Sequence, residues 1–297
     1  MGRGLIAMAM TVVVWAGFAL SVRGIGASSL TTMDAALIRF TVPLLILAPW
    51  IPQTVRAVRR ERPIVLIGLF VGAGLPYFLV AAAGGRMTSA ALVGLIIPGT
   101  VPIFVTLLTY RQKISLPQLA ALGGIVAGVA VAGGGPPDAG TAVLLLAGSI
   151  WAVYTLSLGA GVLDPRGTAI VLCLPSSLLT ALLITTGTVD SNLVHANPAD
   201  LTLYLIVQGA GVGVLAGICY PIAIRRLGSR TAATLGALSP VVTALAAVPL
   251  LGEPLTGLPA LAVVVAGVIL FNLLKREPHA VDDRPRPALA VDGGLRR

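Results

Sequence analysis

The sequence contains few charged residues, few aromatic residues, and almost no cysteine or histidine. Only 10% of its 297 residues are charged, whereas a soluble domain has about 25%. The mean hydropathy is +0.98 and 57% of the residues are apolar, which is more than a water-soluble core can bury. The composition therefore excludes an ordinary soluble domain.

The cysteines and histidines are too few and too scattered to form a reactive centre. Cys173 and Cys219 lie in the middle of apolar stretches, so we interpret them as packing residues. His195 lies between two such stretches and His279 lies near the C-terminus. No Gly-x-Ser-x-Gly or His-Glu-x-x-His motif is present. The sequence predicts no enzyme activity, no cofactor and no metal, and it disfavours the alternative of an intramembrane enzyme.

Long apolar runs dominate the chain. Each run is close to the ~20 residues that a helix needs to cross a bilayer. Ten can be counted, at residues 5–22, 33–51, 63–83, 88–110, 116–133, 141–161, 168–187, 201–224, 231–251 and 256–274. The pattern predicts an all-α polytopic membrane protein with ten transmembrane helices.

The basic residues are distributed unevenly over the connections between these runs. With the N-terminus in the cytoplasm, 17 of the 20 Lys and Arg residues fall on the cytoplasmic side, as the positive-inside rule predicts. Arg23 and Arg86 remain outside, and Arg39 lies within a run. The pattern indicates a multi-pass protein of the cell (inner) membrane with both termini cytoplasmic. The net charge of +9 then reflects topology and contact with the lipid bilayer, not a nucleic-acid partner.

The chain also contains an internal repeat. Residues 88–98 align without a gap to residues 230–240, and residues 73–77 align to 216–220. Trp15 and Trp151 fall in the first helix of each half. Because five spans is an odd number, the second copy must enter the membrane from the opposite face, as in many secondary transporters. We expect two inverted five-helix repeats at 5–134 and 140–274, followed by a Pro-rich, charged and disordered cytoplasmic tail at 275–297.

The motifs within this frame resemble those of a known family. They include the Trp of each first helix, Leu-Ile-Arg-Phe at 37–40, Leu-Ser-Pro at 238–240 and Leu-Gly-Glu-Pro-Leu-Thr at 251–256. From about residue 5 to 274, the chain resembles the ten-span branch of the drug/metabolite transporter superfamily with two EamA domains. It departs from the family in the first half, where residues 110–115 lack the Gly-Glu pair. The resemblance implies a secondary transporter that exports small organic metabolites such as amino acids.

Polar groups at membrane depth are candidates for substrate binding, because burying them in lipid is costly. Trp15 and Trp151 are each about 15 Å along their helices, near the midplane. Arg39 either faces a cavity and binds a substrate carboxylate, or extends outward to the membrane boundary or a helix end. The remaining candidates for substrate contacts are Tyr77, Tyr154, Gln208, Tyr220 and Asn272.

Two prolines and one absence bear on mechanism. Pro98 and Pro240 each lie about ten residues into a predicted span, where we expect a kink or hinge. Proton-driven export of cationic drugs needs a carboxylate at membrane depth, and none is found in the ten runs beyond Asp34 at the start of the second. A metabolite exporter with alternating access is thus favoured, and a cationic multidrug carrier is the alternative. The sequence does not distinguish a monomer from a homodimer.

Overall fold

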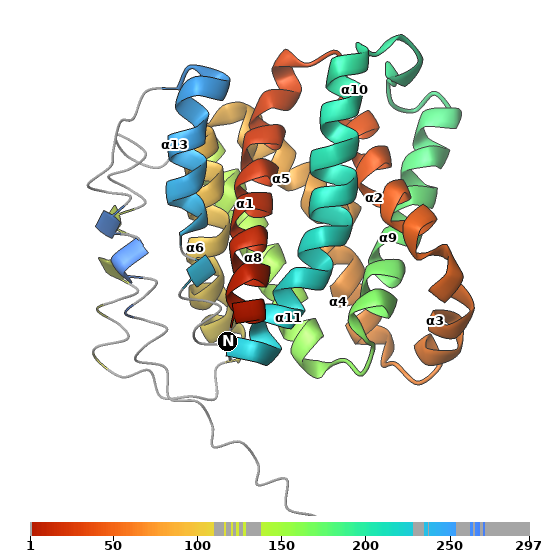
Figure 1. Cartoon of the computed structure of the whole chain (residues 1–297), viewed down its shortest axis with the longest axis horizontal. Coiled ribbons are helices and arrows are strands. Elements are labelled where there is room, and N and C mark those ends of the chain that lie inside the picture. The colour runs from red at the N-terminus through yellow and green to blue at the C-terminus, as the bar shows by residue number, and fades with distance from the viewer. Residues whose placement is uncertain are drawn as a thin grey trace, which may run out of the picture.

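The computed structural model describes residues 2–109, 138–227 and 238–253, with short pieces within 116–128, 235–236 and 262–270. Every long element in these ranges is a helix, as Figure 1 shows. The helices are α1 (Gly2–Gly24), α2 (Thr32–Leu47), α3 (Ile51–Val58), α4 (Pro63–Ala73), α5 (Leu75–Met87), α6 (Ala90–Thr109), α8 (Ala139–Ala160), α9 (Pro165–Thr185), α10 (Pro198–Tyr204), the π-helix η4 (Leu205–Ala216), α11 (Gly217–Leu227) and α13 (Ser239–Leu251). The predicted all-α class is confirmed for this part of the chain.

Within the described part of the chain, six helical stretches are long and apolar enough to cross a membrane, and two shorter helices are also apolar. The long stretches are Gly2–Ala27, Thr32–Val58, Pro63–Met87, Ala139–Ala160, Pro165–Thr185 and Pro198–Tyr220, and the shorter ones are Ala90–Val105 and Ser239–Leu251. They coincide with eight of the predicted spans. The other two, 116–133 and 256–274, lie mostly outside the described residues, so the count of ten remains a prediction. The predicted tail also lies outside them.

Short polar residues at the membrane boundary fix where several helices begin. Thr31 and Asp34 form a capping box at the start of α2, in which each side chain accepts a hydrogen bond from the other's backbone N–H. Asp138 caps α8 through the N–H of Thr141, and Asp164 caps α9 through the N–H of Gly167. Acidic side chains at helix N-termini also interact favourably with the helix dipole.

One of the membrane-crossing stretches is interrupted, and another changes its helix type without a break. The α-helix α4 ends at Ala73, Gly74 adopts an extended conformation (φ −82°, ψ −153°), and α5 begins at Leu75. The Oγ of Ser176 on α9 accepts the hydrogen bond of the Leu75 N–H at 3.0 Å. A buried backbone group freed by a helix break needs such a partner. In the other stretch the π-helix η4 gives way to α11 at Gly217, the residue that the predicted repeat aligns with Gly74.

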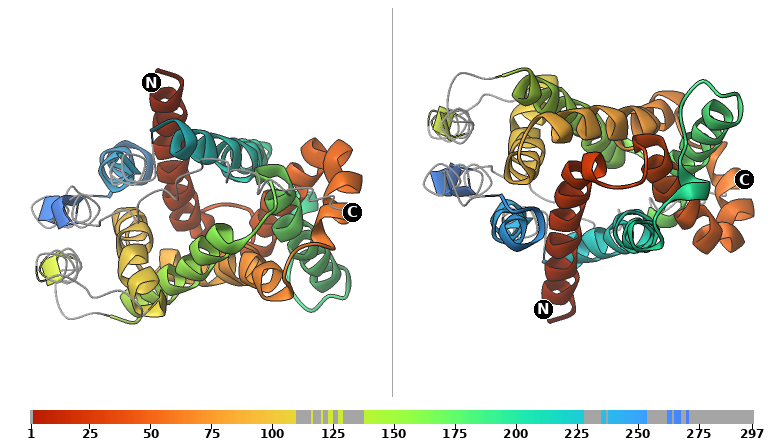
Figure 2. Two further views of the ribbon diagram at one scale, coloured as in Figure 1. Left: turned by 90° about the horizontal axis from the view of Figure 1, so that it is seen from below. Right: turned by 90° about the horizontal axis from the view of Figure 1, so that it is seen from above.

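The helices pack so that the two halves of the chain interleave. The N-terminal helix α1 packs against η4, α11 and α13 from the second half, and α8 packs against α4, α5 and α6 from the first. In addition, α2 packs against α9, and α6 against α13. Viewed end-on in Figure 2, these helices stand side by side around the middle of the molecule. Residues far apart in sequence thus meet along the bundle axis.

The two predicted hinge prolines lie in different settings. Pro98 lies inside α6, as expected, where it lacks the N–H that would bond one turn back. Pro240 lies in the first turn of α13, which begins at Ser239. A first-turn N–H has no intrahelical partner to lose, and since most residues from 228 to 237 lie outside the described part of the chain, the hinge at Pro240 remains a prediction.

Candidate functional site

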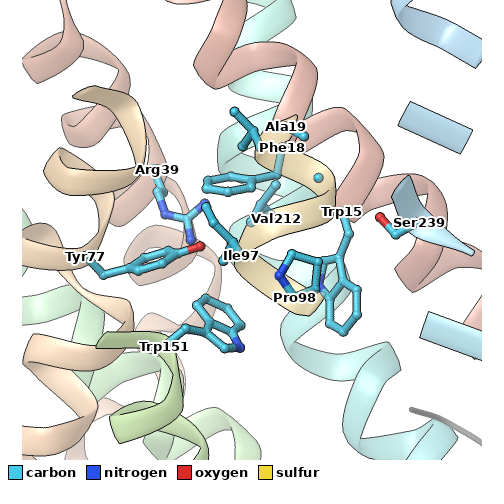
Figure 3. A pocket seen from close by; sticks show the side chains of 12 residues that line it. Trp15, Phe18, Ala19, Arg39, Tyr77, Ile97, Pro98, Trp151, Val212 and Ser239 are labelled. Carbon is cyan, nitrogen blue, oxygen red and sulfur yellow. The ribbon is translucent and has the colours of Figure 1, made fainter. Parts of the chain in front are cut away.

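The middle of the bundle contains a small cavity of about 60 Å³ and a larger one of about 340 Å³. Trp15, Arg39, Trp151 and Val212 border both of them. Figure 3 shows that the labelled side chains around the small cavity come from helices on several sides of the bundle. Such a concave, mainly apolar space with a few convergent polar groups is typical of a small-molecule site.

Aromatic side chains form two matched pairs in these walls. The ring centroids of Trp15 on α1 and Tyr220 on α11 are 5.0 Å apart, with an interplanar angle of 54°. Those of Trp151 on α8 and Tyr77 on α5 are 4.8 Å apart, with an angle of 53°. The predicted repeat aligns Trp15 with Trp151 and Tyr77 with Tyr220, so corresponding residues make corresponding contacts. Tyr154 adds a third ring, 5.1 Å from Trp151.

The side chain of Arg39 lies in the wall shared by the two cavities and is only 6% exposed. Its Nη1 donates a hydrogen bond to Oε1 of Gln208 at 2.8 Å, whereas its Nε has no hydrogen-bond partner. Its guanidinium carbon lies 5.1 Å from the ring centroid of Phe18 and 5.6 Å from those of Phe40 and Phe78. In this position the side chain borders the cavities and does not extend outward to the membrane boundary.

A short chain of hydrogen bonds connects Arg39 with α1. Gln208 is fully buried in the π-helix η4, and its Nε2 donates to Oγ of Ser21 at 2.6 Å. One turn earlier, the hydroxyl of Tyr204 donates to the backbone oxygen of Ser21 at 2.7 Å. The cation is thus held by a neutral amide that also ties η4 to α1.

Polar bonds between distant segments close the end of the bundle beyond Ser21. The carboxylate of Asp34 accepts hydrogen bonds from Ser191 and from the N–H of Asn192, and that of Asp200 accepts two from Ser29 at 2.7 Å. Glu253 accepts the N–H of Ala90 at the start of α6 and forms an ion pair with Arg23, with Nε to Oε1 3.0 Å. Asp34 and Glu253 therefore join segments that are far apart in the sequence.

The larger cavity extends toward the opposite end, where the N-terminus lies in Figure 1. There it is lined by Leu163 and Pro165 of the α8–α9 connection. Glu61 stabilises this connection by accepting hydrogen bonds from the N–H groups of Val162 and Leu163 at 2.7 and 3.3 Å. Burial raises the pKa of the Glu61 carboxyl, but these N–H groups, that of Arg62 and the Arg62 charge more than offset it and hold the pKa below its usual range.

Most of the predicted binding residues are brought together by the structure. Those that line one or both cavities are Trp15, Arg39, Tyr77, Trp151, Tyr154 and Tyr220. Gln208 lies behind Arg39 and contacts it directly, and Asn272 lies outside the described residues. Phe18, Phe40 and Phe78 around the guanidinium were missed by sequence reasoning. Phe18 carried a usable signal, because it lies three residues after Trp15 and so falls on the same face of α1.

Comparison with known proteins supports the same reading of the second half. Residues 138–273 match the model of the EamA-like transporter family. No curated protein sequence matches the chain. A solved crystal structure, described only as that of a protein, covers 92% of this chain and 98% of its own with a TM-score of 0.63. Since the two sequences are 19% identical, this likeness concerns the fold alone. The predicted resemblance is confirmed by this match of residues 138–273 to the EamA-like transporter family, which is consistent with the drug/metabolite transporter superfamily.

Proposed function

We propose that this membrane protein is a secondary transporter that exports small organic metabolites such as amino acids through the cavity around Arg39. The observation that carries the proposal is a buried guanidinium with a free Nε, placed where two cavities meet in the middle of the bundle. A polar side chain at this depth is costly unless it has a function. A substrate carboxylate is a suitable partner, because the planar guanidinium can donate two parallel hydrogen bonds to it.

Alternating access around this site is supported by the matched contacts of the two halves. The Trp–Tyr pairs and the packing of α1 and α8 correspond under the proposed repeat. Two inverted five-helix units around a midplane site can rock against each other so that each end opens in turn. We propose ten spans arranged in this way, with Pro98 in α6 as one of the flexible points.

The charge at the two ends supports one orientation in the cell membrane. Arg3 and the four arginines in and after α3 lie at the end toward which the larger cavity extends, together with Arg166. The positive-inside rule assigns this end to the cytoplasm. The described state then has its cavity directed to the cytoplasm and its outer end closed. A buried cation in the cavity wall disfavours the cationic drug carrier, because like charges repel.

Efflux from proteoliposomes tests the proposed function. Purified protein is reconstituted into liposomes loaded with a panel of labelled amino acids and related organic acids, and release is compared with that from protein-free liposomes. We expect at least one compound to leave faster through the protein. Absence of protein-dependent release for the whole panel would contradict the proposal.

The three tryptophans provide a matched test of the site. Replacing Trp15 or Trp151 by Ala should lower efflux by roughly three- to tenfold, since an aromatic contact contributes about 0.5–1.5 kcal/mol. Trp50 packs under Arg166, with the guanidinium carbon 4.6 Å from its centroid, and does not line either cavity. Trp50→Ala should therefore transport normally. Equal losses in all three variants would exclude a specific role for the cavity pair.

A further inference from the structure

The acidic residues of this chain are used at the ends of helices, not beside Arg39. Six of the 11 Asp and Glu residues accept hydrogen bonds from backbone N–H groups at or between helix ends, namely Asp34, Glu61, Asp138, Asp164, Asp200 and Glu253. The predicted spans 116–133 and 256–274, which are largely outside the described residues, contain no Asp or Glu in their sequence. Among the described residues, no Asp or Glu therefore lines either cavity beside Arg39.

The groups that do surround Arg39 carry no formal negative charge. Gln208 offers a neutral amide oxygen, and Phe18, Phe40 and Phe78 offer ring faces. Ring faces attract a cation only weakly compared with a carboxylate. Water in an open cavity can solvate the remaining charge, but an occluded intermediate excludes water. The empty carrier therefore has to move an uncompensated cation through its closed state.

We propose that Arg39 makes the protein an exchanger of monoanionic organic acids. This inference rests on the proposed function and narrows its substrate class. A carboxylate bound in the cavity beside Arg39 neutralises the guanidinium, so the loaded carrier reorients without a net buried charge. The empty carrier reorients roughly tenfold or more slowly than the loaded one, because moving an uncompensated charge at bilayer depth costs free energy. Substrate on one side of the membrane then accelerates the transport of substrate from the opposite side.

The same charge balance favours a monoanion over a zwitterion. The ammonium of an amino acid would find no carboxylate in the cavity, and it would approach the guanidinium while losing its water. The rings of Trp15, Trp151 and the nearby tyrosines attract an ammonium only in part. An α-keto acid has the carbon skeleton of its amino acid and lacks this second charge. Its carboxyl is fully ionised at neutral pH, so it crosses lipid slowly by itself.

Counter-transport of paired compounds tests the inference on the full-length protein. Labelled alanine, leucine and phenylalanine, and the α-keto acid of each, are offered to proteoliposomes that are either empty or preloaded with the same unlabelled compound. We expect faster uptake of at least one keto acid than of its parent amino acid, and a stimulation by preloading of roughly tenfold or more. Imposing a membrane potential should change uptake into empty liposomes more than exchange, because the charged empty carrier moves only in the first case.

Two variants at Arg39 separate its charge from its shape. Arg39→Lys retains the charge and should retain the stimulation, at a lower affinity. Arg39→Gln removes the charge and should transport at similar rates with and without preloading. Size-exclusion and thermal-unfolding profiles show whether each variant is folded. If Arg39→Gln fails to fold, the comparison of preloaded with empty liposomes for the wild-type protein tests the exchange by itself.

The outcomes distinguish this inference from the proposed function. If amino acids or keto acids are transported and preloading does not stimulate their transport, the protein is not an exchanger, but the proposed transport function stands. If the amino acid of every pair is transported faster than its keto acid, the inferred preference for monoanionic substrates is wrong. Absence of flux for all six compounds overturns this inference, and only failure of the wider efflux panel overturns the transport function.

Discussion

The two ends of the bundle are built differently. At the end beyond Ser21, the carboxylates of Asp34, Asp200 and Glu253 each join segments from different parts of the chain. At the end that contains the N-terminus, Glu61 makes a comparable connection, and the larger cavity approaches the surface next to it. Hydrogen bonds to charged acceptors are stronger than neutral ones, and three such carboxylates hold the first end, which we call the fastened end, whereas Glu61 makes such bonds beside the cavity at the second, the cavity end.

Under the proposed alternating access, this difference indicates which movements a transport cycle would require. Opening the fastened end would break charge-assisted bonds between segments, and closing the cavity end would bring the α8–α9 connection closer to the helices across the larger cavity. The Gln208–Ser21 bond links the two processes, because it connects the Arg39 site with α1 just below the fastened end. The expected effects of breaking either end differ in size.

Removal of Asp34 should have the largest effect. Asp34 is fully buried and accepts three partly buried hydrogen bonds from Thr31, Ser191 and Asn192, so Asp34→Ala removes all three and should lower the free energy of unfolding by about 3 kcal/mol. Asp164 is an exposed N-cap at the other end, and Asp164→Ala should cost about 1 kcal/mol. Thermal unfolding in detergent measures both. Equal losses would show that the two ends are equally fastened.

Removal of the Glu253 charge should have an intermediate effect. Glu253→Gln loses the ion pair with partly exposed Arg23 and weakens the cap of α6, which should favour opening of this end by up to about 1 kcal/mol. The measurement is the labelling rate of a cysteine introduced by Val93→Cys, in a protein from which Cys173 and Cys219 have been removed. Val93 is buried near the start of α6 and lines the small cavity. An impermeant maleimide is added from the fastened side.

Arg86 provides the control for this experiment, because it is exposed, lies at the same end and donates a hydrogen bond to the Thr32 hydroxyl. Arg86→Gln should leave the labelling rate at Val93 unchanged. If Glu253→Gln also leaves it unchanged, the ion pair does not hold this end closed.

The smallest effect is expected from titration of Glu61. Its pKa is held below the usual range, so its contribution to stability is complete above the unfolded pKa of about 4.3 and is lost as the pH falls through the lower folded pKa. The unfolding temperature should drop across this window. Glu61→Gln should show a smaller drop, since its side chain does not titrate there. An identical drop in both proteins would assign the acid sensitivity to other carboxylates.

Much of the architecture could be predicted from apolar patterning alone. Helix starts at Thr32, Pro63 and Pro165 lie within a few residues of the predicted ones, because capping residues and prolines mark them locally. The interruption at Gly74 and the π-helix η4 were not predicted, since they depend on partners such as Ser176 on another helix. The start of α13 at Ser239 was not predicted for a related reason: sequence alone does not show where a helix begins within a continuous apolar run.

The sequence by itself determined that the chain is a membrane protein, which connections carry the basic residues, and which few polar groups lie within apolar stretches. The physical reason is that burying an uncompensated charge in lipid costs free energy. The sequence also supplied the aligned Trp and Tyr residues. The tertiary structure alone decided that these residues meet as Trp15–Tyr220 and Trp151–Tyr77, and that Arg39 turns toward Gln208 and the cavity. Which helices become neighbours depends on packing across the whole bundle, and no local pattern encodes it.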